Sequence, residues 1–268
     1  MTSQTLKLPR HFYRMPPRPC PYLPGRTEQN VFTELAGVDG VALYDILTHA
    51  GFRRSHNIAY RPTCPGCNAC VSVRVVASAF KASRSQRRVL SVNDDLRCTE
   101  RAAAATEEHY DLFAQYVASR HNDGEMAAMG FADYAAMVEE SPLSTYVAEY
   151  RDPNGLLLAA CLADRLSDGL SAVYSYFDTE ATGRSLGTYM VLRLIDRCRE
   201  LGLPYLYLGY WIKGGKKMSY KTRFRPLEAL GADGWTAIAA DSADAAGDAG
   251  DAGNESSPAS ADIEAQQA

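Results

Sequence analysis

"GLSAVYSYFDTEATGRSLGTYMVLRLIDRCRELGLPYLYLGYWI", residues 169–212, is the most informative stretch of this chain for its fold. Its first ten residues are rich in Val, Tyr and Phe, which predicts a strand. "GRSLGTYMVLRLIDRCRELGLP" predicts a helix that is closed by Gly202 and Pro204. "YLYLGYWI" predicts a second strand. The stretch is therefore a strand, a glycine-containing turn, a helix and another strand.

Two further strands are expected just before this stretch. "STYVAEYR" and "GLLLAACLADRL" are separated by the turn "DPNG", and "SDG" separates them from residue 169 onward. Strands joined by such turns form an antiparallel meander. Three meander strands, a turn into a helix and one more strand make a mixed sheet, which is the core order of GNAT-type acyltransferases. In that fold the turn before the helix, here Thr182–Thr188, offers backbone amides to an anion, although a lone glycine turn more often only starts a helix.

The first half of the chain has a different pattern. After a Pro-rich entry, "GVALYDILTHAG" predicts a helix, "FRRSHNIAY" a strand and "CVSVRVVASAF" a second strand, so the cysteine-containing segment between them is expected at the tip of a hairpin. "KASRSQRRVLSVNDDL" and "TEEHYDLFAQYVASRH" predict helices, the second capped by Thr106.

We therefore expect an α+β protein in three parts. An N-terminal cysteine-containing α/β domain takes residues 1–101, and a GNAT-like mixed-sheet acyltransferase domain takes 102–238. Residues 239–268 are an acidic Ala/Gly/Ser tail that cannot bury enough apolar surface to fold, and we expect it to be disordered.

Composition narrows the class of protein. Apolar residues make up 46% of the 268, but they form no run long enough for a transmembrane helix, so no membrane partner is expected. The first ten residues have no apolar segment typical of a signal peptide, which predicts a cytoplasmic protein. Residues 1–101 hold 15 Lys and Arg against 7 Asp and Glu. That excess suggests a polyanionic partner, and solvated arginines explain it equally well.

"RPTCPGCNAC", residues 61–70, carries Cys64, Cys67 and Cys70. The C-x₂-C-x₂-C spacing lets successive sulfurs point into one cavity, so it suits structural zinc or an iron–sulfur cluster. Both need a fourth ligand, and Cys20 in a stiff Pro/Gly loop is the best candidate, with His11 and His56 as reserves. The alternative is a set of reduced free thiols, because seven cysteines in a cytoplasmic chain argue against disulfides. The remaining three cysteines are expected to be small core residues: Cys98, Cys161 and Cys198.

Several long motifs resemble one family. "PCPYLPGR", "GFRRSHNIAYRPTCPGCNACVSVRV" and "SRSQRRVL" resemble the N-terminal domain of arginyl-tRNA–protein transferases, and "YSYFDTEATGRSLGTYMVLRLID" and "YLYLGYWIKGGKKMSYKTRFRPLE" resemble their C-terminal GNAT-like domain. The resemblance covers residues 10–237 and is closest to the short bacterial branch, the aspartate/glutamate leucyltransferases.

The resemblance implies an activity and its partners. Members of that branch transfer leucine from leucyl-tRNA to proteins that begin with Asp or Glu, which marks those proteins for N-degron proteolysis. The eukaryotic branch transfers arginine, and its cysteine region is implicated in cluster binding. The four cysteines of this chain match that region, but their spacing differs from the adjacent cysteines of the eukaryotic pattern. No cofactor is required for the chemistry itself.

The tRNA is expected to bind near "KGGKKMSYKTRFR", residues 213–225. Its basic side chains would meet phosphates, and neighbouring aromatic faces would stack on the unpaired terminal adenine. The alternative is a solvated basic loop. With the turn before the helix included, the candidate tRNA- and substrate-binding residues are Arg184, Ser185, Gly187, Trp211, Lys216, Lys217, Tyr220, Lys221 and Arg223.

The candidate catalytic residues lie near the end of the strand predicted for "GLSAVYSYFD". Asp178 is the expected base or amine orienter, and alternation puts Tyr174 and Tyr176 on one face beside it. Ordinary half-buried tyrosines explain the same pattern. Three other functions stay open: an arginyl-tRNA–protein transferase with the same acceptors, an acetyltransferase that uses acetyl-CoA, and a non-catalytic zinc-ribbon module that binds nucleic acid.

Overall fold

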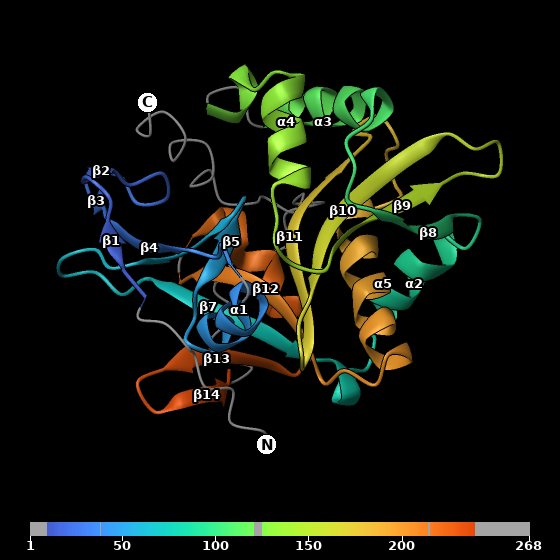
Figure 1. Cartoon of the computed structure of the whole chain (residues 1–268). Coiled ribbons are helices and arrows are strands. Elements are labelled where there is room, and N and C mark those ends of the chain that lie inside the picture. The colour runs from blue at the N-terminus through green and yellow to red at the C-terminus, as the bar shows by residue number, and fades with distance from the viewer. Residues whose placement is uncertain (1–9, 38, 121–124, 214, 239–268) are drawn as a thin grey trace.

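The computed structural model describes residues 10–37, 39–120, 125–213 and 215–238 (Figure 1). The acidic tail expected to be disordered, residues 239–268, lies outside the described residues. The described part has helices and mixed sheets, so the expected α+β class is confirmed. Among the described helices, none has the length and apolar character needed to cross a membrane.

The predicted meander is present. Strands β9 (Thr145–Arg151), β10 (Leu157–Arg165) and β11 (Gly169–Phe177) pair antiparallel in chain order. Helix α5 (Leu186–Glu200) follows, and strand β12 (Tyr205–Ile212) then returns parallel to β11. The expected GNAT-type order of strands is therefore confirmed.

The sheet is wider than the meander predicts. Its eight strands run in the order β14-β13-β7-β12-β11-β10-β9-β8, so β7 (Cys70–Val76) pairs with β12 and β8 (Arg97–Ala102) pairs with β9. Strands β13 (Leu227–Gly231) and β14 (Gly234–Ala237), which the sequence analysis missed, complete the other edge. The division expected at residue 101 is therefore no boundary of this sheet, because both sides contribute strands to it.

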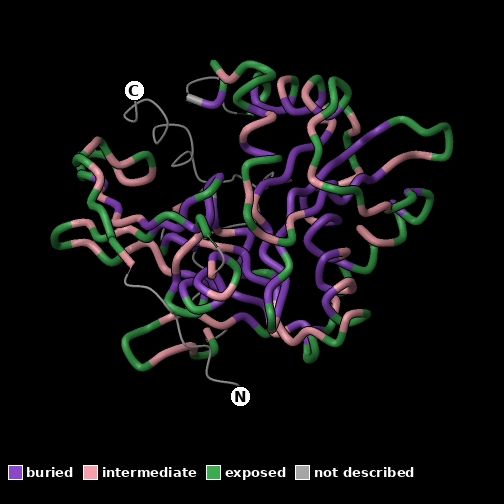
Figure 2. Tube along the Cα trace, in the orientation of Figure 1, coloured by how far each residue is buried: buried purple, intermediate pink, exposed green. Residues whose placement is uncertain are grey.

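Helices cover both faces of the meander. On β9, Glu149 lies 2.9 Å from His109 of α3 (Glu107–Arg120), whereas the ring of the next residue, Tyr150, lies 5.5 Å from the ring of Tyr189 in α5. Successive strand residues point to opposite faces, so α3 and α5 lie on opposite sides of the sheet. Helix α4 (Phe131–Glu139) packs beside α3, and α2 (Arg84–Val92) beside α5. Figure 2 shows the strands between them as the buried core.

Two helix starts follow the local sequence rules. Ser83 and Gln86 form a reciprocal capping box at α2. The hydroxyl of Thr106 accepts a hydrogen bond of 3.1 Å from the backbone N–H of His109, so the predicted cap of α3 is confirmed.

A smaller sheet precedes the large one. Its four strands run in the order β1-β4-β6-β5, with bounds Tyr13–Arg14, Asn30–Glu34, Ile58–Pro62 and Arg53–Ser55. The predicted single strand "FRRSHNIAY" is thus wrong: it is two strands, with a turn at His56, where φ is 47°. Helix α1 (Gly40–His49) packs beside β5, and β2 (Arg18–Pro19) pairs with β3 (Thr27–Glu28). The short helices are η1 (Ala77–Ala79), η2 (Glu125–Ala128) and η3 (Lys216–Arg223).

The cysteine segment was predicted to lie at the tip of a hairpin, and this prediction is wrong. Strand β6 before it belongs to the small sheet, and β7 after it belongs to the large sheet. The segment therefore carries the chain from one sheet to the other.

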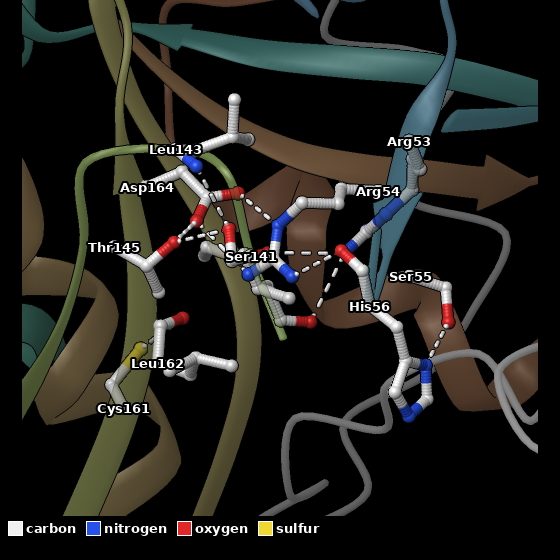
Figure 3. Close-up of polar contacts among 12 residues, drawn as sticks. Arg53, Arg54, Ser55, His56, Ser141, Leu143, Thr145, Cys161, Leu162 and Asp164 are labelled. Atoms are coloured by element: carbon white, nitrogen blue, oxygen red, sulfur yellow. Dashed lines mark hydrogen bonds and ion pairs between the residues drawn. The ribbon is translucent and has the colours of Figure 1, made fainter. Parts of the chain in front are cut away.

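A buried ion pair also connects the two sheets. Arg54 of β5 binds both carboxylate oxygens of Asp164 on β10, at 2.7 and 3.0 Å, and Thr145 donates to the same carboxylate at 2.7 Å (Figure 3). Around it the apolar cluster of Leu43, Tyr44 and Leu47 from α1 packs against Tyr207 of β12. The two sheets thus share one interior.

Candidate functional site

The parallel strands β11 and β12 pair over only part of their length. Register partners run from Gly169 opposite Tyr205 to Ser171 opposite Tyr207, although both strands continue well beyond. The register of β12 against β7 shifts at this same point, between Tyr207 and Gly209. Backbone carbonyls at the carboxyl ends of the two strands therefore need partners from elsewhere. Carboxyl ends of parallel strands are also where open α/β sheets bind ligands.

Arg53 of β5 supplies those partners. Its Nη1 donates to the carbonyl oxygen of Leu208 on β12 at 3.1 Å, and its Nη2 donates to those of Ala172 and Val173 on β11 at 3.0 and 3.2 Å. Gly209 makes room for this side chain, because a Cβ there would overlap the guanidinium, and its φ of 74° also favours glycine. Arg53 thus joins the two diverging strands from the neighbouring sheet.

Lys221 lies close to Arg53 in the interior. Its side chain is 2% exposed, and its Nζ donates to the carbonyl oxygen of Tyr210 at 2.6 Å. Burial holds the pKa of Lys221 well below its usual range, and the positive charge of Arg53 lowers it further. The predicted phosphate contact does not fit this lysine, because its amine faces the protein interior.

The rest of the basic segment divides into buried and exposed side chains. The segment is the short helix η3 rather than an open loop, and Trp211, Tyr220 and Phe224 are buried. Their ring faces are therefore not offered to a terminal adenine in this arrangement. Arg223 is exposed, as is Lys213, so these two cations remain candidates for phosphate contact. The side chains of Lys216 and Lys217 lie outside what the structure describes.

The turn before α5 is held by contacts within the protein. Arg184 makes a bidentate ion pair with Asp95, with distances of 2.8 and 2.9 Å. The backbone carbonyl oxygen of Arg184 also accepts a hydrogen bond from the side chain of Asn93. Ser185 has a φ of 50° and does not cap the helix through its side chain. Gly187 is buried in the first turn of α5. Anion binding at this turn stays a prediction.

Asp178 follows the last residue of β11. Its Oδ1 accepts a hydrogen bond of 2.8 Å from the backbone N–H of Glu180, and its own N–H donates to the carbonyl oxygen of Leu158. The carboxylate is only partly buried, so it is accessible at the carboxyl end of the strand. Its role as base or amine orienter stays a prediction.

Tyr174 and Tyr176 share one face of β11, as alternation predicts, and both are buried beneath α3 and α4. The hydroxyls of Tyr176 and Tyr134 are 2.6 Å apart, and burial raises the pKa of Tyr176 well above its usual value. These contacts match the packing role that half-buried tyrosines usually have. A catalytic role for the two tyrosines stays a prediction.

The structure brings the four cysteines of the expected metal site near one another. Burial, followed by the charges of Cys64, Cys20 and Cys67, raises the pKa of Cys70 to about 12. The Sγ of Cys64 also accepts a hydrogen bond from the N–H of Gln29, which follows β3. The N-terminal arm therefore lies against the cysteine segment. The reserve ligands lie elsewhere, since His56 is in the β5–β6 turn and the carbonyl oxygen of His11 binds Thr33.

The remaining three cysteines differ in how far they are buried. Cys161 and Cys198 are buried as predicted, but Cys98 is exposed. The prediction for Cys98 is wrong because β8 is the edge strand of the sheet and has only one neighbour.

Comparison with known proteins identifies the family. The family model "Arginine-tRNA-protein transferase, C terminus" matches residues 108–231, and "Arginine-tRNA-protein transferase, N terminus" matches residues 18–88. The chain is 53% identical to the aspartate/glutamate leucyltransferase of Paramagnetospirillum magneticum, over 87% of this chain and 96% of that protein. It is 55% identical to the aspartate/glutamate leucyltransferase of Parvibaculum lavamentivorans, over 88% and 98%. This chain belongs to the arginine-tRNA-protein transferase family.

Among solved structures, that of L-PGS from Bacillus licheniformis is similar over 67% of this chain and 52% of that chain, with a TM-score of 0.43 and 10% identity. This similarity is too low to support a functional assignment. The two matched regions of the transferase meet at the site described above, because Arg53 lies in the first and Leu208 in the second.

A metal in this transferase family member would need suitable donors in a suitable arrangement. Four thiols are the donor set that zinc and iron–sulfur clusters prefer. Among the described residues, however, no three His, Cys, Asp or Glu side chains are arranged so as to hold a metal ion. The donor chemistry fits a metal and the present positions do not, so the metal stays a prediction.

Arg53 is the site residue that the sequence analysis of this transferase missed. The only local signal was the pair Arg53–Arg54 in a short alternating segment, which puts the two arginines on opposite faces of one strand. Their partners lie more than a hundred residues away in sequence, on β10, β11 and β12. No local pattern could therefore indicate which arginine binds an acid.

Proposed function

We propose that this protein transfers leucine from leucyl-tRNA to the N-terminal Asp or Glu of acceptor proteins. The observation that carries the proposal is the identity of 49–55% to relatives named aspartate/glutamate leucyltransferase, which extends over 87–88% of this chain. That identity spans both matched regions of the family, so it includes the residues on either side of the β11–β12 junction.

The transfer reaction requires few catalytic groups from the protein. The aminoacyl ester of a charged tRNA is already activated, and the attacking group is an α-amine with a pKa of about 7.7–8.0 when free. A sizeable fraction of that amine is neutral at cellular pH, so a strong base is unnecessary. Holding the amine and the ester carbon together can supply most of the rate. The oxyanion then needs stabilising, and the leaving ribose hydroxyl needs a proton.

Several residues support this assignment of tasks. Asp178 lies at the carboxyl end of β11 with a partly exposed carboxylate, which suits an orienter of the α-amine. Lys213 directly follows β12 and Arg223 is the last residue of η3. Both are exposed, so they suit phosphates of the tRNA 3′ end. Asp178, after β11, and Lys213, after β12, lie beyond the point where these two strands stop pairing.

A separate zinc-ribbon module is less well supported. Strand β7 begins at Cys70 and is an interior strand of the large sheet, with β12 on one side and β13 on the other. The cysteine segment is therefore continuous with the core and is not a detachable module. An acetyl-CoA-dependent activity would leave the N-terminal region without a role.

We further propose a cytoplasmic location and a place before N-degron proteolysis, since both follow from the substrates. The four cysteines Cys20, Cys64, Cys67 and Cys70 would take a zinc ion or an iron–sulfur cluster after local rearrangement. Such a group would fix the N-terminal arm and has no part in the transfer step.

The test is a transfer assay with purified protein. Radiolabelled leucyl-tRNA or arginyl-tRNA is mixed with a peptide that begins with Asp. Label should enter the peptide from leucyl-tRNA and far less from arginyl-tRNA. The reverse preference would replace the leucyl assignment with an arginyl one, and no transfer from either donor would remove the proposed function.

A further inference from the structure

Two basic side chains near the β11–β12 junction, Arg53 and Lys221, have no carboxylate partner in the described part of the chain. Arg53 donates only to backbone carbonyls, of Leu208, Ala172 and Val173, and Lys221 donates to the carbonyl oxygen of Tyr210. The guanidinium has more N–H groups than these three carbonyls occupy, and Arg53 is half-buried rather than fully enclosed. It can therefore accept another hydrogen-bonding partner.

The adjacent residue shows what a satisfied arginine looks like in this protein. Arg54 is wholly buried, and Asp164 neutralises it with two hydrogen bonds of 2.7 and 3.0 Å (Figure 3). A charge removed from water is costly unless an opposite charge compensates it. Arg53 differs from Arg54 in this respect, because its guanidinium donates hydrogen bonds to backbone carbonyls and not to a carboxylate. The protein thus compensates the charge of Arg54 with an acid, whereas the described contacts of Arg53 are with backbone carbonyls.

Lys221 lies on the inner side of Arg53, and its Nζ donates to the carbonyl oxygen of Tyr210. Burial and then the positive charge of Arg53 lower the pKa of Lys221, so the two groups interact electrostatically. A carboxylate that contacts Arg53 would offset the charge of Arg53 and favour the protonated form of Lys221. Arginine suits such a contact because its planar group matches a carboxylate with two parallel hydrogen bonds.

We propose that Arg53, supported by Lys221, binds the side-chain carboxylate of the acceptor's N-terminal Asp or Glu. The proposal rests on the proposed leucyl transfer for its choice of ligand. It assigns acceptor specificity to the junction of β11 and β12, where Arg53 contacts the carbonyls of Ala172 and Val173.

The first test uses variants that keep hydrogen bonds and remove charge. Arg53→Gln and Lys221→Gln still offer an N–H group to the carbonyls. Arg53→Gln should raise the KM for an Asp-initiated peptide at least about tenfold, the range expected for loss of a charged hydrogen bond. The KM for leucyl-tRNA should stay unchanged, and the preference for Asp over Asn peptides should fall. Lys221→Gln should show the same pattern to a smaller extent, because Lys221 acts through Arg53.

The matched control is Arg87→Met. Arg87 is an exposed arginine that also donates to a backbone carbonyl, that of Ala82 at 2.7 Å, and it lies on α2. This change should leave both KM values as in the parent protein. If Arg53→Gln lowers activity with both substrates equally, or keeps the Asp-over-Asn preference, Arg53 has a structural role only and the proposal is wrong.

A second measurement uses the unaltered protein and needs neither folding of a variant nor catalysis. Arg53 is modified with phenylglyoxal, and mass spectrometry measures its modification with and without peptide. A peptide that begins with Asp should protect Arg53, and the same peptide with Asn should not. Equal protection by both peptides, or an Arg53 that never reacts, would overturn the proposal. Protection by the Asp peptide without leucyl transfer would keep the carboxylate site and reject the proposed activity.

Discussion

Arg54 and Asp164 form an ion pair in which neither side chain exposes any surface, with both carboxylate oxygens bound to the guanidinium. The pair spans two sheets, because Arg54 lies on β5 of the small sheet and Asp164 on β10 of the large one. The next residue along β5, Arg53, reaches β11 and β12 instead. Strand β5 therefore fixes the small sheet against the part of the large sheet where the proposed reaction takes place.

Breaking this ion pair should strongly destabilise the protein. Arg54→Met leaves the Asp164 carboxylate buried without its cation, so we expect a loss of about 3–5 kcal/mol in the free energy of unfolding. Urea denaturation measures it. Glu108→Gln is the control, because Glu108 is 52% exposed in its pair with Arg151 and should change the free energy by about 1 kcal/mol or less. A loss from Arg54→Met as small as that of the control would contradict the account.

Stability should also depend on His49. Its hydrogen bond with Asp168, at 3.3 Å, outweighs burial and raises the pKa of His49 above its usual value. A raised folded-state pKa means that the contribution is complete below the unfolded value of about 6.5 and is lost as pH rises through the folded value. Urea denaturation of the parent and of His49→Gln should therefore differ most at the acidic end of this window and converge above it. A difference that is constant with pH would contradict the assignment.

Local patterns account for the core of the fold. The meander, α5 and β12 could be predicted because each has a strong period and clear turn residues, and Thr106 could be predicted as a cap from its own chemistry. The long-range pairings could not. β7 looks like half of a hairpin in the sequence, yet it crosses to the other sheet and pairs with β12 and β13. Nothing within a few residues of β7 specifies that choice.

The site was less predictable than the fold for the same reason. Lys221 looks like one more cation in a basic segment, and only its contact with Tyr210 reveals a buried position. Arg53 looks like its neighbour Arg54, and only the tertiary structure gives one an acid and the other three carbonyls. The residue types indicated which contacts each side chain could make. Burial in the folded protein determined which of those contacts form.

Asp178 should matter for the transfer step. Asp178→Asn keeps an oxygen that can accept from the N–H of Glu180, so the turn should survive. Loss of the carboxylate should lower kcat by about a hundredfold if it orients or deprotonates the α-amine. Single-turnover kinetics with leucyl-tRNA measures the change. A variant with unchanged kcat would remove Asp178 from the catalytic residues.

The exposed cations near η3 should determine the salt dependence of tRNA binding. Replacing Lys213 and Arg223 with Ala should weaken tRNA binding and reduce the slope of log K against log salt by about 0.7 for each phosphate that is no longer neutralised. Replacing Lys216 and Lys217 should act in the same direction. Binding measured from low to high salt tests this, with Lys221→Gln as the control whose slope should not change. An unaltered slope in the Lys213 and Arg223 variant would place the tRNA elsewhere.

The cysteines give a prediction that is independent of activity. If they bind a metal, Cys67→Ser and Cys20→Ser should each lose it and lower the melting temperature, because the metal would close the 44-residue separation between Cys20 and Cys64. Metal analysis and visible absorbance after anaerobic purification distinguish zinc from iron–sulfur. Cys98→Ser is the control, since Cys98 is exposed on β8. If the parent protein contains no metal under any purification condition, the four cysteines are free thiols and the metal prediction is wrong.

The most direct test of the central claim is one competition reaction analysed by mass spectrometry. Purified protein receives leucyl-tRNA and arginyl-tRNA together with four peptides that differ only in an N-terminal Asp, Glu, Asn or Gln. We expect one leucine on the α-amine of the Asp and Glu peptides and no modification of the amide peptides. Leucine on all four peptides alike, or arginine as the added residue, would contradict it.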